Sequence, residues 1–405
     1  MSRLAVWMYG TQVGVLSRRR DALGFSYTQG ALDDGLGRPL LSVAMPTRPA
    51  AYRGAVPAAF FDGLLPEGEA RRMIAFDFGV DERDVMGLLT AIGRDCAGAL
   101  VIIPDGDALD EGGVAEPIGD GQVAQRLRAL RFAPLGVDQR VRVSLAGVQE
   151  KLLLARAGGG WGLPIDGAPS THIVKPAHQF LADSIANEAF CMRLARHLDI
   201  PAASVETREF EGIPVLVVER YDRDRAPAGD GRVTRLHQED FCQARALPTQ
   251  RKYEQHGGAS LRQCAETLSR WSRRADQLSQ LLDYVTLNVL VGNADAHAKN
   301  LSLLHEPGGE VRLAPAYDVM STVQYPNVST IPGMFVNAVR DINDVRREDL
   351  IAEAVSWGMA PGPAAEQIER VVRGAGEAIG PAAAETRPPD DLVERVQARR
   401  QTLGA

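Results

Sequence analysis

Short apolar runs separated by glycine and charged residues fill the first hundred positions of the chain. Three such runs within residues 4–28 predict short strands, and GALVIIP at 98–104 predicts a buried strand. FFDGLLPEGEARRMIAFDFG has helical spacing after Pro66, which suits the first turn of a helix. Residues 1–105 are therefore expected to form a β-rich subdomain. The Asp- and Gly-rich stretch that follows predicts a linker or surface loop over residues 106–140.

The rest of the chain changes from a mixed pattern to a helical one. VRVSLAGVQEKLLLA predicts a strand, a loop and a second strand, and THIVKP and IPVLVVERYDR each predict a further strand. Apolar positions repeat at helical spacing over residues 184–200 and 277–293, and Gly292 is the expected C-cap of the second helix. We therefore expect a mixed region at residues 141–235 and a mainly helical one at residues 236–405.

Composition narrows the class of protein. The 405 residues are enough for two or three domains, and 45% hydrophobic with 24% charged residues is typical of globular proteins. A net charge of −7 argues against a general nucleic-acid coat. Four scattered cysteines favour a reducing compartment, and neither a signal peptide nor an apolar run of about 20 residues is apparent. The expectation is a soluble, cytoplasmic protein without a membrane partner.

Lysine is unusually rare. The 45 basic residues include only four lysines, which are Lys151, Lys175, Lys252 and Lys299. Lysine is a compact point charge, whereas arginine is a wide planar fork, so lysine is expected to persist where arginine does not fit. A tight phosphate pocket is one such place.

The segment GNADAHAKN, residues 292–300, concentrates chemically active side chains just past a predicted helix end. LSLLH, the turn EPGGE and VRL follow it and predict a β-hairpin. A turn centred between Gly308 and Gly309 would place Asn300 opposite Tyr317, beside Asp318.

Mg·ATP chemistry requires an Asn and an Asp that lie close together, near a further Asp. Mg²⁺ prefers oxygen ligands from few side chains together with phosphates and water, which Asn300 and Asp318 could supply. Asp295 could accept or orient the proton of an attacking hydroxyl. Lys299 could neutralise charge that develops on the transferred phosphoryl group.

Other segments supply the remaining parts of a nucleotide site. THIVKP places Lys175 on a strand, with Glu188 on the next helix as its partner. SLAGVQEK, residues 144–151, suits a phosphate-covering loop, but it lacks the ending of a P-loop, and an ordinary hairpin explains it equally well. VVERYDR at 217–223 could line an adenine, although a buried strand with a charged end is the better interpretation of that segment alone.

In this order, SLAGVQEK, THIVKP, VERYDR, RLHQEDFCQ, KYE, GNADAHAKN and LAPAYD resemble the HipA family of serine/threonine kinases, the toxins of HipBA-type toxin–antitoxin modules. FFDGLLPEGEARR is similar to the N-terminal domain of that family, and the resemblance covers roughly residues 1–375. It implies an α+β, two-lobed protein-kinase-like (HipA) fold. Residues 1–105 would be the β-rich N-terminal subdomain, residues 141–235 the ATP-binding region, and residues 236–405 the mainly α-helical catalytic lobe.

The resemblance also implies roles for single residues. Asp295 would be the catalytic aspartate, Asn300 and Asp318 would bind Mg²⁺, and Ser144 would be an autophosphorylation site whose modification ejects the phosphate loop. The residues expected to bind ATP are Ala146, Gly147, Val148, Gln149, Glu150, Lys151, Lys175, His297, Asn300, Tyr317 and Asp318, with Glu219, Arg220 and Tyr221 at the adenine end. Tyr221 stands where the family commonly has phenylalanine, and VQE replaces its usual AQE or AQP.

The implied partners are a small helix-turn-helix antitoxin, operator DNA reached mainly through that antitoxin, and an aminoacyl-tRNA synthetase as substrate. A small-molecule kinase of the aminoglycoside type is an alternative, although it would lack SLAGVQEK and FFDGLLPEGE. A catalytically weak co-repressor would have lost one of its key polar residues, and none is missing. A metal hydrolase using His297 and His305 lacks the usual histidine spacing. Lys252, Tyr253 and Glu254 could shape a substrate cleft, but a structural role is the favoured interpretation.

Overall fold

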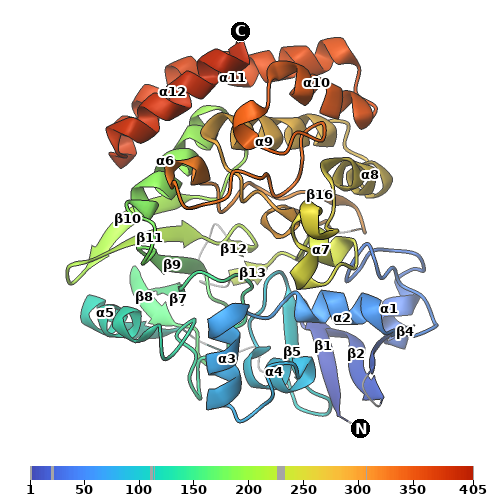
Figure 1. Ribbon diagram of the computed structural model, residues 1–405. Coiled ribbons are helices and arrows are strands. Elements are labelled where there is room, and N and C mark those ends of the chain that lie inside the picture. Colours follow the sequence, from blue (N-terminus) through green and yellow to red (C-terminus); the bar gives the residue numbers. More distant parts are fainter. Residues whose placement is uncertain are drawn as a thin grey trace.

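The N-terminal subdomain is one antiparallel sheet with helices beside it. The computed structural model describes residues 2–19, 22–109, 113, 115–225, 233–306 and 308–404. The sheet has the strand order β4-β3-β2-β1-β5, with β1 Arg3–Met8, β2 Thr11–Arg19, β3 Ala22–Tyr27, β4 Tyr52–Arg53 and β5 Leu100–Pro104. Its helices are α1 Gln29–Asp33, α2 Ala55–Asp62, α3 Gly68–Asp77 and α4 Val85–Ile92. Helix α2 packs against β3 and α4 against β5 (Figure 1), and the strands expected within residues 4–28 and at 98–104 are confirmed.

A six-stranded antiparallel sheet forms the middle of the molecule. Its order is β10-β11-β9-β7-β8-β6, with β6 Glu116–Ile118, β7 Leu152–Ala157, β8 Gly160–Leu163, β9 His172–Pro176, β10 Val205–Phe210 and β11 Ile213–Glu219. Helices α5 Asp120–Ala129 and α6 Ser184–His197 both pack against β10.

The expectation of a linker over residues 106–140 was wrong in its second part. This stretch contains strand β6 and helix α5. Val123, Ala124 and Leu127 are buried on one face of that helix, and the Asp- and Gly-rich sequence before it obscured their helical spacing. Residues 110–112 and 114 of the expected linker lie outside the described residues.

A strand was also expected at VRV, residues 141–143, just before the predicted phosphate loop at residues 144–151. The described chain has no strand there. Val143 forms a single bridge with Asp95, and Val141 forms another with Ile165. Because the two partners come from different segments, no ladder can extend along this stretch. The second expected strand, β7, does form.

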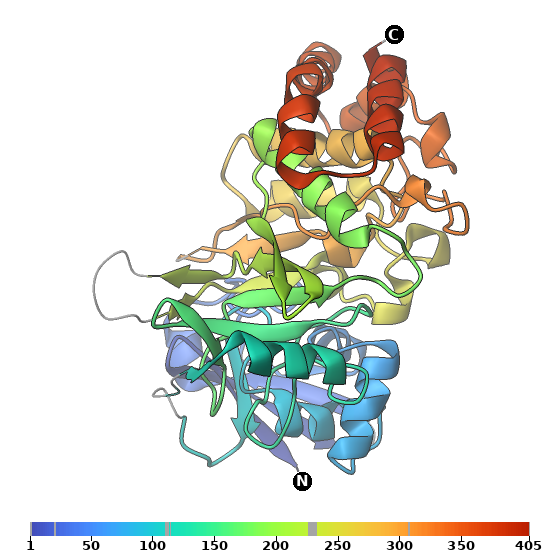
Figure 2. The same ribbon diagram turned by 90° about the vertical axis from the view of Figure 1, so that its left-hand side faces the viewer.

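The middle sheet separates two hydrophobic cores. Val215 and Val217 of β11 belong to the core of the N-terminal subdomain, whereas Leu216 and Val218 face the core of the C-terminal lobe. Successive side chains of a strand point to opposite faces, so a continuous apolar run suits a strand buried on both sides. Figure 2 shows the three layers stacked, with the middle sheet between the N-terminal subdomain and the C-terminal helices.

The C-terminal lobe is mainly helical, as expected. Its helices are α7 Phe241–Ala244, α8 Leu261–Trp271, α9 Gln277–Val291, α10 Arg347–Ser356, α11 Pro361–Thr386 and α12 Asp390–Gly404. Single 3₁₀ turns lie at 249–251, 254–256, 298–300, 322–324 and 342–344. Helix α11 packs against α6, α9, α10 and α12. Gly292 ends α9 at φ 72°, which confirms the predicted C-cap. In the part of the chain that the structure describes, no helix has the length and apolar character to span a membrane.

Two small β elements accompany these helices. Strands β12 Arg223–Arg225 and β13 Val233–Arg235 form a ribbon, and β14 Gln238–Asp240, β15 Ser302–His305 and β16 Val311–Leu313 form a sheet. The predicted hairpin, β15–β16, is therefore confirmed, but its predicted register was wrong. Leu304 pairs with Arg312, and the backbone N–H of Glu306 donates to the carbonyl of Glu310, so the ladder is centred on Gly308.

This shift removes the predicted pairing of Asn300 with Tyr317. The ladder ends at Leu303 and Leu313, and Asn300 lies beyond it, in the 3₁₀ turn at 298–300. Pro307 of the predicted turn lies outside the described residues.

Candidate active site

The loop after α9 is held together by its own hydrogen bonds around Asp295. The Asn300 side-chain amide donates to the Asp295 carbonyl at 3.0 Å, and the His297 backbone N–H donates to the same oxygen at 2.8 Å. The Asp295 carboxylate accepts a hydrogen bond from the Tyr253 hydroxyl at 2.6 Å. The loop therefore presents Asp295 and Asn300 as one rigid unit.

Lys175 lies between two carboxylates, one of which the sequence had assigned to it. Its ammonium donates to Glu188 Oε1 at 2.7 Å and to Asp318 Oδ1 at 2.5 Å. Burial by itself lowers the pKa of Lys175, but Asp318 and Glu188 outweigh it and raise that pKa above the ordinary value. Lys175 in turn lowers the pKa of Asp318 to about 2. Lys175 and Asp318 are therefore both charged at neutral pH.

Asp295, Asn300 and Asp318 gather around two buried side chains. The carboxylates of Asp295 and Asp318 both oppose the lowering of the pKa of His297, which burial causes. Both also add to the raised pKa of Tyr284, whose hydroxyl donates to the Asn300 carbonyl at 2.9 Å. These effects place the carboxylates of Asp295 and Asp318 in one region of the lobe, although the hairpin register that suggested it was wrong. The meeting of Asp295, Asn300 and Asp318 around one metal ion stays a prediction.

The Tyr317 side chain links the Asp318 segment to the loop at residues 292–300. The Tyr317 hydroxyl donates to the Lys299 carbonyl at 2.7 Å. Asp318 itself has a left-handed backbone, at φ 57°, which aspartate tolerates better than most residues and which is common at functional sites.

The donor set suits a magnesium ion. One oxygen of Asp318 binds Lys175, while its second oxygen and the side-chain oxygen of Asn300 accept no hydrogen bond from the described residues. Nowhere in the described chain do three or more His, Cys, Asp or Glu side chains gather in a way that could hold a metal. A site built from one carboxylate and one amide matches Mg²⁺, which completes its shell with phosphate and water oxygens.

The same geometry disfavours a metal hydrolase that uses His297 and His305. Both ring nitrogens of His305 are engaged, with the Pro39 carbonyl at 2.7 Å and with Glu239 at 3.0 Å.

The phosphate loop is folded onto the site. Lys151 donates to the Ala146 carbonyl at 2.8 Å, and burial, followed by the nearby Lys175, lowers the pKa of Lys151 to about 8. Gly147 has φ 112°, a conformation that residues with a side chain rarely adopt, so this position favours glycine. A Cβ there would also displace the Lys151 ammonium, which would lie 2.5 Å from it. Val148 and Glu150 are exposed, whereas Gln149 is half-buried.

The N-terminal subdomain holds this loop from below. The Ser144 hydroxyl is fully buried and donates to the Leu64 carbonyl at 2.8 Å, and the Glu67 backbone N–H donates to the Gly147 carbonyl at 3.3 Å. Ser144 therefore cannot receive a phosphoryl group unless the loop moves.

The residues expected at the adenine end divide into two groups. The ring of Tyr221 lies 5.6 Å from that of Tyr317, next to the site, and its hydroxyl donates to Gln238. The Arg220 guanidinium is instead buried against Asp222 at 2.8 Å, and Glu219 is exposed to solvent. The backbone of Arg220 is engaged as well, since its N–H donates to the Thr171 carbonyl at 2.9 Å and its carbonyl accepts the Arg223 N–H at 3.3 Å. Contact of Arg220 with a nucleotide thus stays a prediction that this geometry does not favour.

Lys299 is engaged inside the protein. Its ammonium is buried, 3.2 Å from Asp240 and 3.2 Å from the Gly63 carbonyl, with Glu67 at 3.9 Å. Burial lowers its pKa, but the two carboxylates outweigh this and raise it. Contact with a transferred phosphoryl group thus stays a prediction that this geometry does not favour.

Sequence reasoning missed Glu67 and undervalued Tyr253. The Glu67 carboxylate pairs with Lys252 at 2.9 Å and approaches Lys299, so two of the four lysines meet one acid. The scarcity of lysine was a usable signal, but Glu67 lies 185 residues before Lys252, and nothing in the sequence links them.

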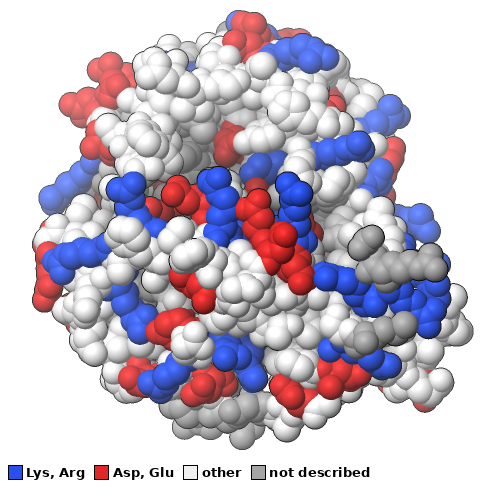
Figure 3. Space-filling model, turned by 60° about the horizontal axis from the view of Figure 1, so that its bottom comes forward, with Lys and Arg blue, Asp and Glu red and all other residues white. Residues whose placement is uncertain are grey.

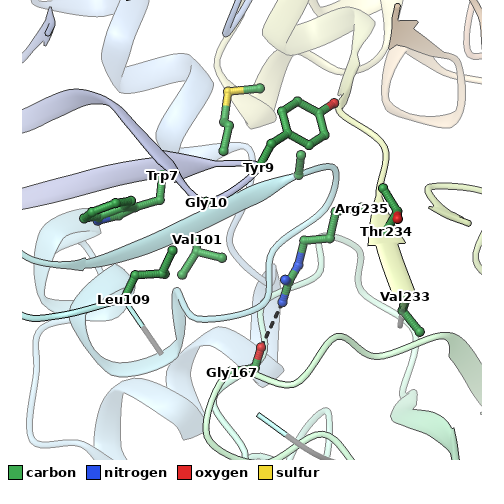
Figure 4. A pocket seen from close by; sticks show the side chains of 11 residues that line it. Trp7, Tyr9, Gly10, Val101, Leu109, Gly167, Val233, Thr234 and Arg235 are labelled. Atoms are coloured by element: carbon green, nitrogen blue, oxygen red, sulfur yellow. Dashed lines mark hydrogen bonds between the residues drawn. The ribbon is translucent and has the colours of Figure 1, made fainter. Parts of the chain in front are cut away.

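One cavity lies apart from this site. It has a volume of about 250 Å³ and is lined by strands β1, β5 and β13, with Trp7, Tyr9 and Arg235 among its residues (Figure 4). Arg235 donates to the Gly167 carbonyl at 2.9 Å at its edge. None of the predicted site residues lines it.

Comparisons with known proteins show the family to which the chain belongs. The profile of the HipA-like C-terminal domain family matches residues 143–379, and that of the HipA N-terminal domain family matches residues 4–103. The chain is 41% identical over 334 residues to the protein Y4mE of Sinorhizobium fredii, covering 80% of this chain and 79% of that one. It is 31% identical over 332 residues to the serine/threonine-protein kinase toxin HipA of Shewanella oneidensis, covering 79% and 76%.

The fold of the chain is also similar to that of a solved structure. The complex of HipA, HipB and operator DNA from Shewanella oneidensis MR-1 contains a chain that matches with a TM-score of 0.84 at 28% identity. The match covers 99% of this chain and 95% of that one. The protein therefore belongs to the HipA kinase family and has its fold.

Proposed function

We propose that the protein is an ATP- and Mg²⁺-dependent serine/threonine protein kinase that acts as a growth-arresting toxin in the cytoplasm. The observation that carries the proposal is the contact of Lys175 with both Glu188 and Asp318, beside Asp295 and Asn300. Kinases need a strand lysine aimed by an acid, a metal-binding Asp and Asn, and an Asp at the acceptor hydroxyl, and all of these side chains are present together.

Each side chain then has a defined task. Mg·ATP, when bound, supplies the phosphoryl group. Lys175 would orient the phosphates, Asn300 and Asp318 would hold the metal, and the Asp295 carboxylate would accept the proton of the acceptor hydroxyl. Lys151 and the backbone of residues 146–150 cover the phosphates and limit the access of water.

The proposed binding partners of the protein are suggested by its relatives. The solved Shewanella protein is in complex with HipB and operator DNA, which supports a small antitoxin of that kind and DNA contact through it. Figure 3 shows acidic and basic side chains interspersed over the described part of the lower face, which fits indirect better than direct DNA binding. An aminoacyl-tRNA synthetase is the proposed substrate, and Ser144 the proposed autophosphorylation site.

Two other functions are weaker. The Leu64 and Glu67 contacts bind the phosphate loop to a whole N-terminal subdomain, a part that the aminoglycoside-type kinase hypothesis does not require. A co-repressor without activity would have no need of the intact set of Lys175, Asp295, Asn300 and Asp318.

Labelled ATP tests the proposal. The purified protein is incubated with ATP, Mg²⁺ and a lysate of its host, and the labelled proteins are identified. We expect one dominant labelled protein, and we expect labelling to disappear when Mg²⁺ is chelated.

The Asp295→Asn variant provides the specific test. Its labelling rate should fall by at least about a hundred-fold because the proton acceptor is lost, while its ATP affinity, measured by calorimetry, should change little. Full activity in this variant would refute the role of Asp295, and the absence of any labelling by the unchanged protein would refute the kinase proposal.

A further inference from the structure

Within the described residues, Tyr253 donates the one side-chain hydrogen bond to the Asp295 carboxylate. Its hydroxyl donates to Oδ1 at 2.6 Å, and Oδ2 accepts no hydrogen bond from the described protein. Burial, together with the Asp295 charge, raises the pKa of Tyr253, so the hydroxyl stays protonated and remains a donor. One oxygen of the carboxylate is thus fixed and the other is left for an incoming group.

The tyrosine is itself fixed from several sides. The Lys252 carbonyl accepts the Ala298 backbone N–H at 3.1 Å, and the Tyr253 carbonyl accepts that of Gly258 at 3.0 Å. The Tyr253 ring stands edge-on to His297, with 4.9 Å between ring centroids. A hydroxyl held in this way restricts the carboxylate that it binds.

Contacts of the neighbouring Lys252 connect Tyr253 to the N-terminal subdomain. The Lys252 ammonium pairs with Glu67 at 2.9 Å, and Glu67 reaches the phosphate loop through its backbone. This charged pair is half-buried, so solvent and salt screen it less than an exposed pair, and it restrains the residue next to Tyr253.

We propose that Tyr253 is the positioning residue of Asp295, anchored through Lys252 to Glu67 of the N-terminal subdomain. This proposal rests on the proposed kinase function, because the orientation of Asp295 affects the rate only if Asp295 is the proton acceptor. With Oδ1 bound to the tyrosine, Oδ2 points to the acceptor and takes its proton. A misplaced proton acceptor lowers the rate of transfer without changing how ATP binds.

A blocking role for Tyr253 would predict the opposite change in rate. The Tyr253 hydroxyl could occupy the place of the acceptor hydroxyl and act as a plug that substrate must displace. Removing it would then raise the rate, whereas removal of a positioning group lowers it.

The test compares Tyr253→Phe with the unchanged protein. This variant keeps the ring and loses only the hydroxyl. In steady-state phosphoryl transfer we expect kcat to fall by about 10- to 100-fold, with KM for ATP and the calorimetric ATP affinity within about two-fold of the unchanged protein. Tyr52→Phe is the matched control, since Tyr52 donates to the Pro46 carbonyl in the N-terminal subdomain, and its kcat should stay unchanged.

A double-mutant cycle tests the anchor. Lys252→Met should lower kcat by about 3- to 10-fold, and adding it to Tyr253→Phe should cause no further loss, because both changes act through one contact. Fully additive losses would overturn the anchoring role of Lys252.

A structural measurement separates this inference from the kinase proposal. Crystal structures without nucleotide should show the Asp295 carboxylate rotated in Tyr253→Phe and unchanged in Tyr52→Phe. An unrotated carboxylate, or an unchanged or raised kcat in Tyr253→Phe, would overturn the positioning role. If the unchanged protein transfers no phosphate at all, the kinase proposal fails, while the crystal comparison still decides whether Tyr253 orients Asp295.

Discussion

Two clusters of buried charge in this protein differ in one property, which is whether every charge has a partner. The junction cluster consists of Asp95, Arg220, Asp222, Arg223 and Arg235, where the N-terminal subdomain meets the middle sheet. The catalytic cluster consists of Lys175, Glu188, Asp295, Asn300 and Asp318. Both cross between layers of the fold, so position alone does not distinguish them.

The junction cluster is closed. Asp95 is fully buried and lies 3.0 Å from Arg223, 3.2 Å from Arg235 and 3.6 Å from Arg220. Its carboxylate also accepts from the Ser170 hydroxyl at 2.6 Å. Burial alone would raise the pKa of Asp95, but the arginines lower it below its usual value. The Asp95 carboxylate is therefore fully engaged by these partners.

The catalytic cluster is open. The side chain of Asp318 is 42% exposed although it touches a buried lysine. Nearby, His297 Nδ1 and Glu67 Oε1 are buried and have no hydrogen-bond partner. Together with the exposed oxygen of Asp318, these unpaired atoms are polar groups that a bound ligand would satisfy.

The largest expected effect separates activity from stability at the open cluster. Asp318→Asn removes a metal-binding charge, so phosphoryl transfer should fall by at least about a thousand-fold, which is about 4 kcal/mol of barrier. The free energy of unfolding, measured with urea, should change little, because the lost charge is partly exposed. A variant that unfolded easily and kept its activity would reverse the comparison.

The next largest effect is expected at the junction cluster, where a substitution should lower stability and leave activity unchanged. Asp95→Asn leaves three arginine charges without their shared partner, so the free energy of unfolding should fall by about 3 kcal/mol. Activity per folded molecule should remain close to that of the unchanged protein. Asp84→Asn is the control, since its pair with Arg18 is partly exposed and should contribute less than about 1 kcal/mol.

The smallest effect is a difference in acid sensitivity. Arginines lower the pKa of Asp222 although burial opposes them, so the unfolded chain binds more protons than the folded one. The stability that Asp222 contributes is therefore complete above its unfolded pKa, about 3.9, and is lost as the pH falls below it. Between pH 5 and pH 3 the unchanged protein should lose about 1 kcal/mol more than Asp222→Asn. Equal slopes in urea titrations across this range would show that Asp222 is not coupled to folding.

Local signals in the sequence identified several features that the structure contains. The segment GNADAHAKN, the Lys175–Glu188 pair and the Gly292 cap all follow from neighbouring residues and their chemistry. The hairpin register was wrong because a turn with two adjacent glycines permits either of two centres. The helix in residues 120–129 was missed because an acidic, Gly-rich stretch precedes it.

Contacts between distant residues could not be predicted. Lys299 looked like a catalytic cation, yet it is buried against Asp240 and the Gly63 carbonyl. Arg220 looked like part of the adenine site, yet its guanidinium binds Asp222 and Asp95. In both cases the residue type allowed two roles, and the partners selected one. For Lys299 these partners are distant in the sequence, whereas Arg220 combines the neighbouring Asp222 with the distant Asp95.

The sequence by itself determined which side chains are present and which local elements carry them, because hydrophobic spacing, caps and short motifs act over a few residues. The tertiary structure alone decided which charges are neutralised and which are left open, since that depends on partners brought together by packing. Glu67, Tyr253 and Asp95 acquire their roles only there.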